Sequence, residues 1–101
     1  MNAAVEPIEV KNNPEASRFE VHLGDNKLAQ IAYVMEDQII IFVHTEVPKE
    51  FGGRGIADKM AQTALEYAKA QHFQVMALCP FVKAYIERHP EYKSITVDYP
   101  G

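Results

Sequence analysis

A glycine-rich segment at residues 47–57, VPKEFGGRGIA, joins a strongly apolar run to an amphipathic one and so divides the chain into two halves of different hydrophobic period. Glycines let the backbone approach an anion closely, and the first turn of a helix leaves N–H groups unpaired with a partial positive charge. Arg54 adds a full charge on a forked donor. The segment is typical of a phosphate-binding turn, and the alternative of a tight strand-to-helix turn that binds nothing stays open.

Two common phosphate-binding loops do not fit this segment. A Walker loop ends in Gly-Lys-Ser or Gly-Lys-Thr, and the sequence contains neither. The dinucleotide fingerprint needs a third glycine three residues after Gly55, where Asp58 stands.

The first half has the pattern of antiparallel strands. Apolar residues alternate with polar ones over 19–23, turn residues follow at 24–26, and a second run covers 27–35. The run at 39–43 is continuously β-branched or aromatic, which predicts a central strand buried on both faces. A weaker strand is predicted at 8–11.

The second half changes to helical spacing. An apolar stripe predicts a helix over residues 54–71, and a short buried strand follows at 74–78. A right-handed crossover places that strand parallel to the central one. Pro80 suits the first position of another helix, whose apolar residues run over 82–89 until Pro90 stops it.

Composition limits the classes of function. The length of 101 residues predicts one domain, 1–101, and 48% hydrophobic with 24% charged residues is typical of a folded protein. A net charge of −4 disfavours nonspecific binding to nucleic acid and is compatible with a cationic or amine partner. No secretory leader and no apolar stretch of about 18 residues is found, so we expect a cytoplasmic protein with no membrane partner.

Metal chemistry is not indicated. Cys79 is the single cysteine, so an internal disulfide and a zinc site of several thiolates are both excluded. His22, His72 and His89 lack the spacing of metal ligands. We predict no metal.

The order of these elements resembles the Gcn5-related N-acetyltransferases (GNAT). The runs HTEVP (44–48), GIA (55–57), LCPFV (78–82), YI (85–86) and HPEY (89–92) look like the small YjdJ-like branch of acetyltransferases. The resemblance spans about residues 19–92. It implies an α/β fold in which an antiparallel β-meander precedes a β-α-β-α unit with a splayed parallel strand pair.

The resemblance also implies a site for acetyl-CoA as cosubstrate. In the family the pantetheine arm pairs with the strand before the turn, and the pyrophosphate rests on the turn. The cofactor-binding residues carried over are Thr45, Val47, Gly52, Gly53, Arg54, Gly55, Ile56 and Ala57. Relatives usually have Gln or Arg where Gly52 stands, which predicts weaker affinity. The expected lack of an N-terminal helical wall leaves the acceptor site open or completed by a partner.

Two residues after the second parallel strand have predicted catalytic roles. Tyr85 stands where relatives carry a tyrosine that protonates the leaving thiolate, and its alternative is structural packing. Cys79 lies before a Pro-started helix, where it accepts the acetyl group, acts as acid and base, or is an inert core residue.

Two residues on the central strand complete the predicted set. Alternating register puts His44 and Glu46 on one face, where they deprotonate an incoming ammonium. The alternative is a satisfied core histidine beside a solvated strand end. A backbone N–H near Val47 is the oxyanion donor that the resemblance implies.

The sequence therefore predicts an acyltransferase that moves an acetyl group from acetyl-CoA to an amine. The alternatives are a non-catalytic module that binds CoA or acyl-CoA, and a protein-interaction domain with an exposed sheet edge. Polyamines, lysine side chains, protein N-termini and small amines all remain candidate acceptors, and a homodimer is compatible with the sequence.

Overall fold

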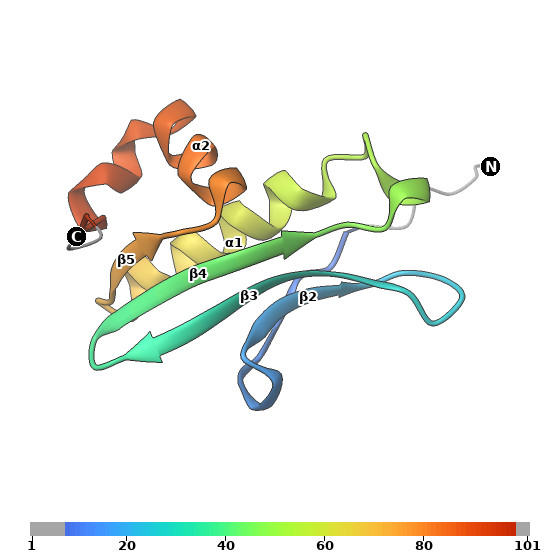
Figure 1. Cartoon of the computed structure of the whole chain (residues 1–101), viewed down its shortest axis with the longest axis horizontal. Coiled ribbons are helices and arrows are strands. Elements are labelled where there is room, and N and C mark those ends of the chain that lie inside the picture. Colours follow the sequence, from blue (N-terminus) through green and yellow to red (C-terminus); the bar gives the residue numbers. More distant parts are fainter. Residues whose placement is uncertain (1–7, 99–101) are drawn as a thin grey trace.

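The computed structural model describes residues 8–98, which form a five-stranded sheet crossed on one face by a long helix (Figure 1). In spatial order the strands are β1 (Lys11–Asn13), β2 (Arg18–His22), β3 (Leu28–Glu36), β4 (Ile39–Glu46) and β5 (Gln74–Ala77). The first four strands pair antiparallel, whereas β4 and β5 are parallel. Helix α1 (Ile56–Ala70) connects β4 to β5, and α2 (Pro80–Arg88) follows β5. Short 3-10 helices are η1 (Pro14–Ala16), η2 (Lys49–Phe51) and η3 (Pro90–Ile95).

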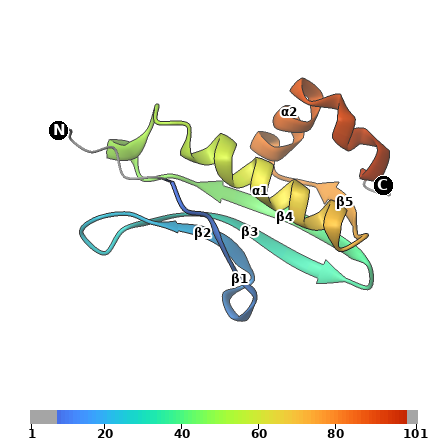
Figure 2. The same cartoon turned by 180° about the vertical axis from the view of Figure 1, so that it is seen from behind.

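Helix α1 packs on the sheet through the predicted apolar stripe, as the two opposite views show (Figures 1 and 2). Its buried residues recur every three or four positions and are Ile56, Met60, Ala61, Ala64, Leu65 and Ala68. Full burial of one large apolar side chain contributes about 1.5–3 kcal/mol. The helix starts two residues later than predicted because Gly55 has a φ of 76°, a left-handed conformation that glycine adopts without steric cost.

The end of the described chain folds back onto β5 and α1. Pro80 occupies the first turn of α2, and His89 ends that helix, both as predicted. Beyond the predicted elements, the Tyr92 hydroxyl donates to the Glu66 carboxylate at 2.6 Å. The Val97 N–H then donates to the Val75 carbonyl at 2.8 Å. These contacts hold η3 and the residues after it against α1 and the outer edge of β5.

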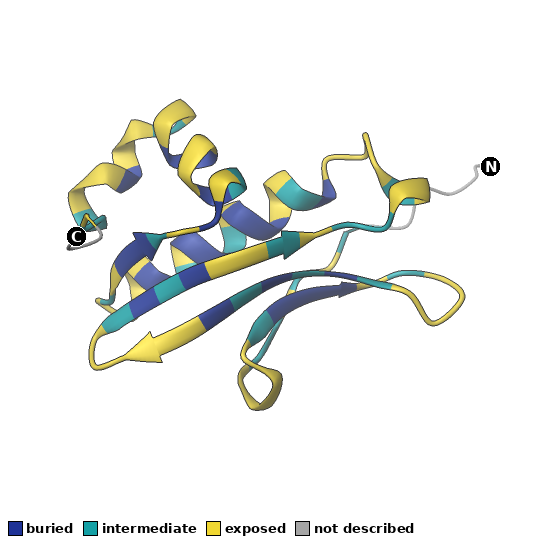
Figure 3. Ribbon diagram, viewed as in Figure 1, coloured by how far each residue is buried: buried dark blue, intermediate teal, exposed yellow. Residues whose placement is uncertain are grey.

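The predicted α/β order of a β-meander followed by a β-α-β-α unit with a parallel pair is confirmed, but two details were wrong. The first strand is Lys11–Asn13 rather than residues 8–11. The central strand β4 is not buried on both faces: Ile40 and Phe42 are fully buried, whereas Ile41 is half-buried and Val43 is exposed (Figure 3). The reason is that α1 covers only one face, and no helix of the described chain covers the other, which we call the open face (Figure 1).

A buried carboxylate lies on the open face of β2. Glu20 is 6% exposed and accepts hydrogen bonds from Arg18 at 2.7 Å and Asn13 at 3.4 Å, and its second oxygen lies 2.8 Å from His22 Nε2. The hydrogen bond from Arg18 lowers the pKa of Glu20 below its ordinary value of 4.5, against the opposing effect of burial. The ionised form is therefore the one that the fold stabilises.

No helix within residues 8–98 is both long enough and apolar enough to span a membrane.

Replacement of Glu20 by Gln has an expected effect that depends on pH. Because the folded pKa is depressed, the stabilisation is complete above the unfolded pKa of about 4.5 and is lost as the pH falls through the folded value. We expect E20Q to lower the free energy of unfolding by about 1–3 kcal/mol at pH 7 and by less near pH 3, which lies below the unfolded pKa. Urea unfolding at both pH values measures this, and a difference that stays constant with pH would contradict the assignment.

Candidate functional site

Strands β4 and β5 separate after four paired positions. Their pairing runs from Ile39 with Gln74 to Phe42 with Ala77. The Phe42 carbonyl then accepts from the N–H groups of both Leu78 and Cys79, each at 3.0 Å. No backbone hydrogen bond within the described chain joins residues 43–46 to the segment that follows β5. This end of β4 therefore has a free edge on the side of β5.

A β-bulge at Val43 decides which side chains of β4 point to each face. Ala32 pairs with His44 and Tyr33 pairs with Phe42, so Val43 has no partner on β3. Beyond the bulge, Thr45 lies opposite the fully buried Ile31 and shares its helix-covered face. His44 and Glu46 consequently lie on the open face.

The hydroxyl of Thr45 meets the thiol of Cys79 across the separated strands. Thr45 Oγ1 and Cys79 Sγ are 3.0 Å apart. Cys79 is 3% exposed and is the N-cap residue of α2, and its carbonyl accepts from the Lys83 N–H at 3.0 Å. Backbone and side-chain contacts thus fix Cys79 where β4 and β5 part.

His44 and Glu46 are neighbours on the open face. His44 Nε2 lies 3.7 Å from Glu46 Oε1, and the two side chains are 62% and 61% exposed. Gln30 also donates to Glu46 Oε1 at 3.3 Å. The structure contradicts the alternative of a buried core histidine. It places this pair on the opposite face of β4 from Thr45 and Cys79.

The glycine turn leaves room and donors for an anion. Gly53 and Gly55 have φ values of 79° and 76°, and a Cβ built on either would meet no atom within 4 Å. The Lys59 N–H bonds to the Gly55 carbonyl, but no protein acceptor is found in the described chain for the N–H groups of residues 53–58. The Arg54 guanidinium lies 5.1 Å from the centre of the Phe51 ring. These features fit a diphosphate at the N-terminus of α1.

Tyr85 packs between the helices and makes no hydrogen bond to Cys79. Its ring is 5% exposed and stacks on His89 with centroids 4.1 Å apart. Burial raises the pKa of the Tyr85 hydroxyl, and the carboxylates of Asp58 and Glu91 add to this effect. The hydroxyl therefore stays protonated at neutral pH and has no hydrogen-bond partner within residues 8–98.

Sequence reasoning missed two charged residues beside the turn. Asp58 lies in the first turn of α1, and its Oδ1 is 3.5 Å from Arg88 Nη2 at the end of α2. Arg88 also lies over the Tyr85 ring, 5.5 Å from its centre. The one available signal was the spacing of Tyr85 and Arg88, which puts them on the same face of a helix.

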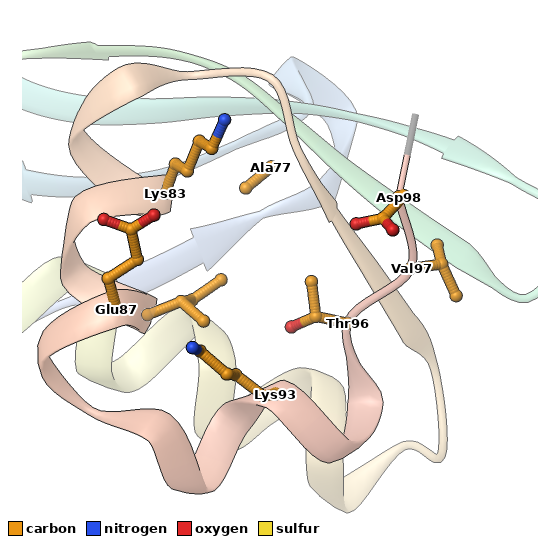
Figure 4. Close-up of a pocket in the computed structure, with 8 residues that line it drawn as sticks. Ala77, Lys83, Glu87, Lys93, Thr96, Val97 and Asp98 are labelled. Carbon is orange, nitrogen blue, oxygen red and sulfur yellow. The ribbon is translucent and has the colours of Figure 1, made fainter. Parts of the chain in front are cut away.

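A surface hollow of about 370 Å³ lies on the other side of β5 (Figure 4). Its lining includes Ala77, Ile86, Lys83, Glu87, Lys93 and Asp98. None of the predicted site residues lines this hollow. Part of its wall is formed by residues 93–98, where the chain returns after α2, and the sequence did not predict this return. Within residues 8–98 no group of three His, Cys, Asp or Glu residues is close enough to hold a metal ion.

Known proteins resemble this chain in sequence and in fold. Residues 18–95 match the sequence model of a family described as GCN5-related N-acetyltransferase. Protein NATD1 of Gallus gallus and that of Mus musculus are each 30% identical to this chain over 87 residues, which are 83% of this chain and 78% of the relative. The solution structure of a GCN5-like protein from Staphylococcus aureus aligns with a TM-score of 0.72 and 26% identity, covering 95% of this chain and 94% of that one.

The position of Cys79 predicts a protected thiol. Because the side chain is 3% exposed and contacts Thr45, we expect a bulky disulfide reagent to label the native protein at least about tenfold more slowly than the urea-unfolded chain. Since Cys79 is the single cysteine, absorbance of the released thiol reports this residue alone. Equal labelling rates in the two states would contradict the observed burial.

Proposed function

Since the chain belongs to the GCN5-related N-acetyltransferase family, we propose that it transfers an acetyl group from acetyl-CoA to an amine acceptor. The observation that supports this most is the separation of β4 from β5 directly before the open glycine turn. A free strand edge suits the amide-rich pantetheine arm, and unpaired N–H groups at a helix N-terminus suit a diphosphate. The two lie in succession along one stretch of chain, residues 43–58.

The proposed cofactor contacts follow this stretch. The edge at Thr45 and Val47 would hold the pantetheine arm. The turn made by Gly52, Gly53, Arg54, Gly55, Ile56 and Ala57 would hold the diphosphate. Gly52 is extended, with a φ of −66° and a ψ of 155°, and offers no side chain to the ligand. Arg54 is then the cation that the turn itself supplies.

The two faces of β4 suggest separate roles in the transfer. An amine nitrogen attacks the thioester carbonyl, a C–N bond forms, the C–S bond breaks, the amine loses a proton and the CoA sulfur gains one. His44 and Glu46, exposed on the open face, would take the proton of an amine that approaches from that face. Cys79 and Tyr85 lie on the helix-covered side, where the sulfur would depart. A backbone N–H near Val47 would bind the oxyanion.

Cys79 has two proposed roles that lead to different products on the protein. As a nucleophile its sulfur takes the acetyl group from the thioester, CoA leaves as the thiol, and the amine then removes the acetyl group. As an acid it gives a proton to the CoA sulfur during direct transfer. The Thr45 hydroxyl lies 3.0 Å from the sulfur and, in either case, can donate a hydrogen bond to it or accept one from the thiol.

A second candidate function is a module that binds CoA or acyl-CoA without turnover. It is supported by the open face, on which no described helix forms a wall for an acceptor (Figure 1). Such a module would keep the proposed cofactor contacts of residues 43–58 and lose nothing when Cys79 or Tyr85 is replaced.

Binding of acetyl-CoA and its dependence on the turn form the first test. We expect saturable one-to-one binding by calorimetry and a loss of at least about tenfold in affinity for G55E, because a carboxylate at this position would repel the diphosphate. The matched control is G55Q, which has nearly the same size and the same strain at a φ of 76° without the charge. Equal affinities of folded G55E and G55Q would place the diphosphate elsewhere.

Catalysis is tested by variants that spare the turn. With a panel of primary amines we expect C79A and Y85F to retain acetyl-CoA affinity and to release CoA thiol at least about tenfold more slowly. Mass spectrometry of wild-type protein after incubation with acetyl-CoA alone shows whether Cys79 carries an acetyl group. Binding without amine-dependent thiol release, in wild type as in both variants, would favour the non-catalytic module.

A further inference from the structure

Both carboxylates that flank the glycine turn are paired with cations from distant parts of the chain. Glu50, two residues before Gly52, forms an ion pair with Lys27 of the β2–β3 loop. Asp58, in the first turn of α1, pairs with Arg88 of α2 at 3.5 Å. An anion bound at the turn would meet repulsion from each carboxylate if that carboxylate were unpaired. The two ion pairs reduce this repulsion.

Arg88 differs from Lys27 in where it lies and how it is held. Its guanidinium contacts Asp58 in the first turn of α1, the turn whose N–H groups are unpaired, and the side chain is 55% exposed. The Tyr85 ring supports one side of it at 5.5 Å. A guanidinium has five donors in a planar fork, and a single contact of 3.5 Å to Asp58 leaves most of them free. Arg88 can therefore donate hydrogen bonds to a second anion without a large conformational change.

We propose that Arg88 is a phosphate-binding residue for the cofactor diphosphate and that Asp58 competes with the diphosphate for it. This inference rests on the proposed function, because it assigns residues toward acetyl-CoA. In the free protein Asp58 holds Arg88 beside the first turn of α1. With ligand bound, the guanidinium donates to the diphosphate. It neutralises the negative charge of the diphosphate that remains when Arg54 is the only cation paired with it. Arg88 on α2 and Arg54 on the turn then hold the anion from two elements.

If Asp58 competes with the diphosphate for Arg88, replacing Arg88 and replacing Asp58 should change the affinity for acetyl-CoA in opposite directions. R88M keeps an aliphatic stem on the Tyr85 ring but removes the charge, and we expect it to weaken acetyl-CoA binding by about tenfold or more. D58N removes the competitor and the nearby negative charge, so we expect it to tighten binding several-fold. R88K should recover part of the loss, since it restores the charge without the fork.

The matched control is K83M, on the same helix. It makes the same change of charge, but Lys83 lines the hollow beyond β5 rather than the turn. We expect its acetyl-CoA affinity to equal that of wild type. Thermal unfolding followed by circular dichroism shows that each variant is folded before calorimetry.

Two further experiments test whether Arg88 contacts the diphosphate directly. If Arg88 merely neutralised Asp58, R88M would cost nothing in a D58N background; direct contact predicts that the tenfold loss persists there. With dephospho-CoA, which lacks the 3′-phosphate, the loss should also persist, because the contact is to the diphosphate. Disappearance of the loss in either arm overturns the proposal.

The outcomes separate this inference from the proposed function. Wild-type binding together with an R88M affinity equal to that of K83M would overturn the role of Arg88 and leave the cofactor site standing. Absence of wild-type binding at millimolar acetyl-CoA would overturn both.

Discussion

The carbonyl of Phe42 is the point on which the functional geometry depends. It accepts the last two hydrogen bonds from the segment after β5, and beyond it the two parallel strands no longer pair. The bulge at Val43 lies at the same place and changes which face each following side chain occupies. An unpaired strand edge costs free energy when it is buried without a partner, so a ligand with amide groups is its natural complement.

The same break in pairing distributes chemistry over two faces. Thr45 and Cys79 meet on the side covered by the helices, whereas His44 and Glu46 stand exposed on the open face. If Val43 occupied a regular strand position instead of a bulge, simple alternation would place His44 on the same face as Phe42, in the core. The bulge thus turns His44 and Glu46 to the open face, where the proposed function needs proton-accepting groups.

The sequence predicted the elements well because their causes are local. Hydrophobic period identified the hairpin, β4 and α1, and Pro80 marked the start of α2. The open face of β4 was missed because a run of β-branched residues does not reveal how many faces helices will cover. The bulge, the pairing of Thr45 with Cys79 and the reach of Arg88 to Asp58 depend on contacts between residues far apart in the chain. Apart from the helical spacing of Tyr85 and Arg88, pattern analysis of one sequence contains no signal for these contacts.

The hollow beyond β5 and the separated ends of β4 and β5 are two distinct places for a ligand, and amide chemical shifts distinguish them directly. In ¹⁵N-labelled protein titrated with acetyl-CoA, our account predicts saturable shift changes at residues 43–47 and 52–58 and at Arg88. Residues around Lys93 and Asp98, which line the hollow, should change little. Shift changes concentrated at the hollow, with residues 43–58 unaffected, would contradict the account.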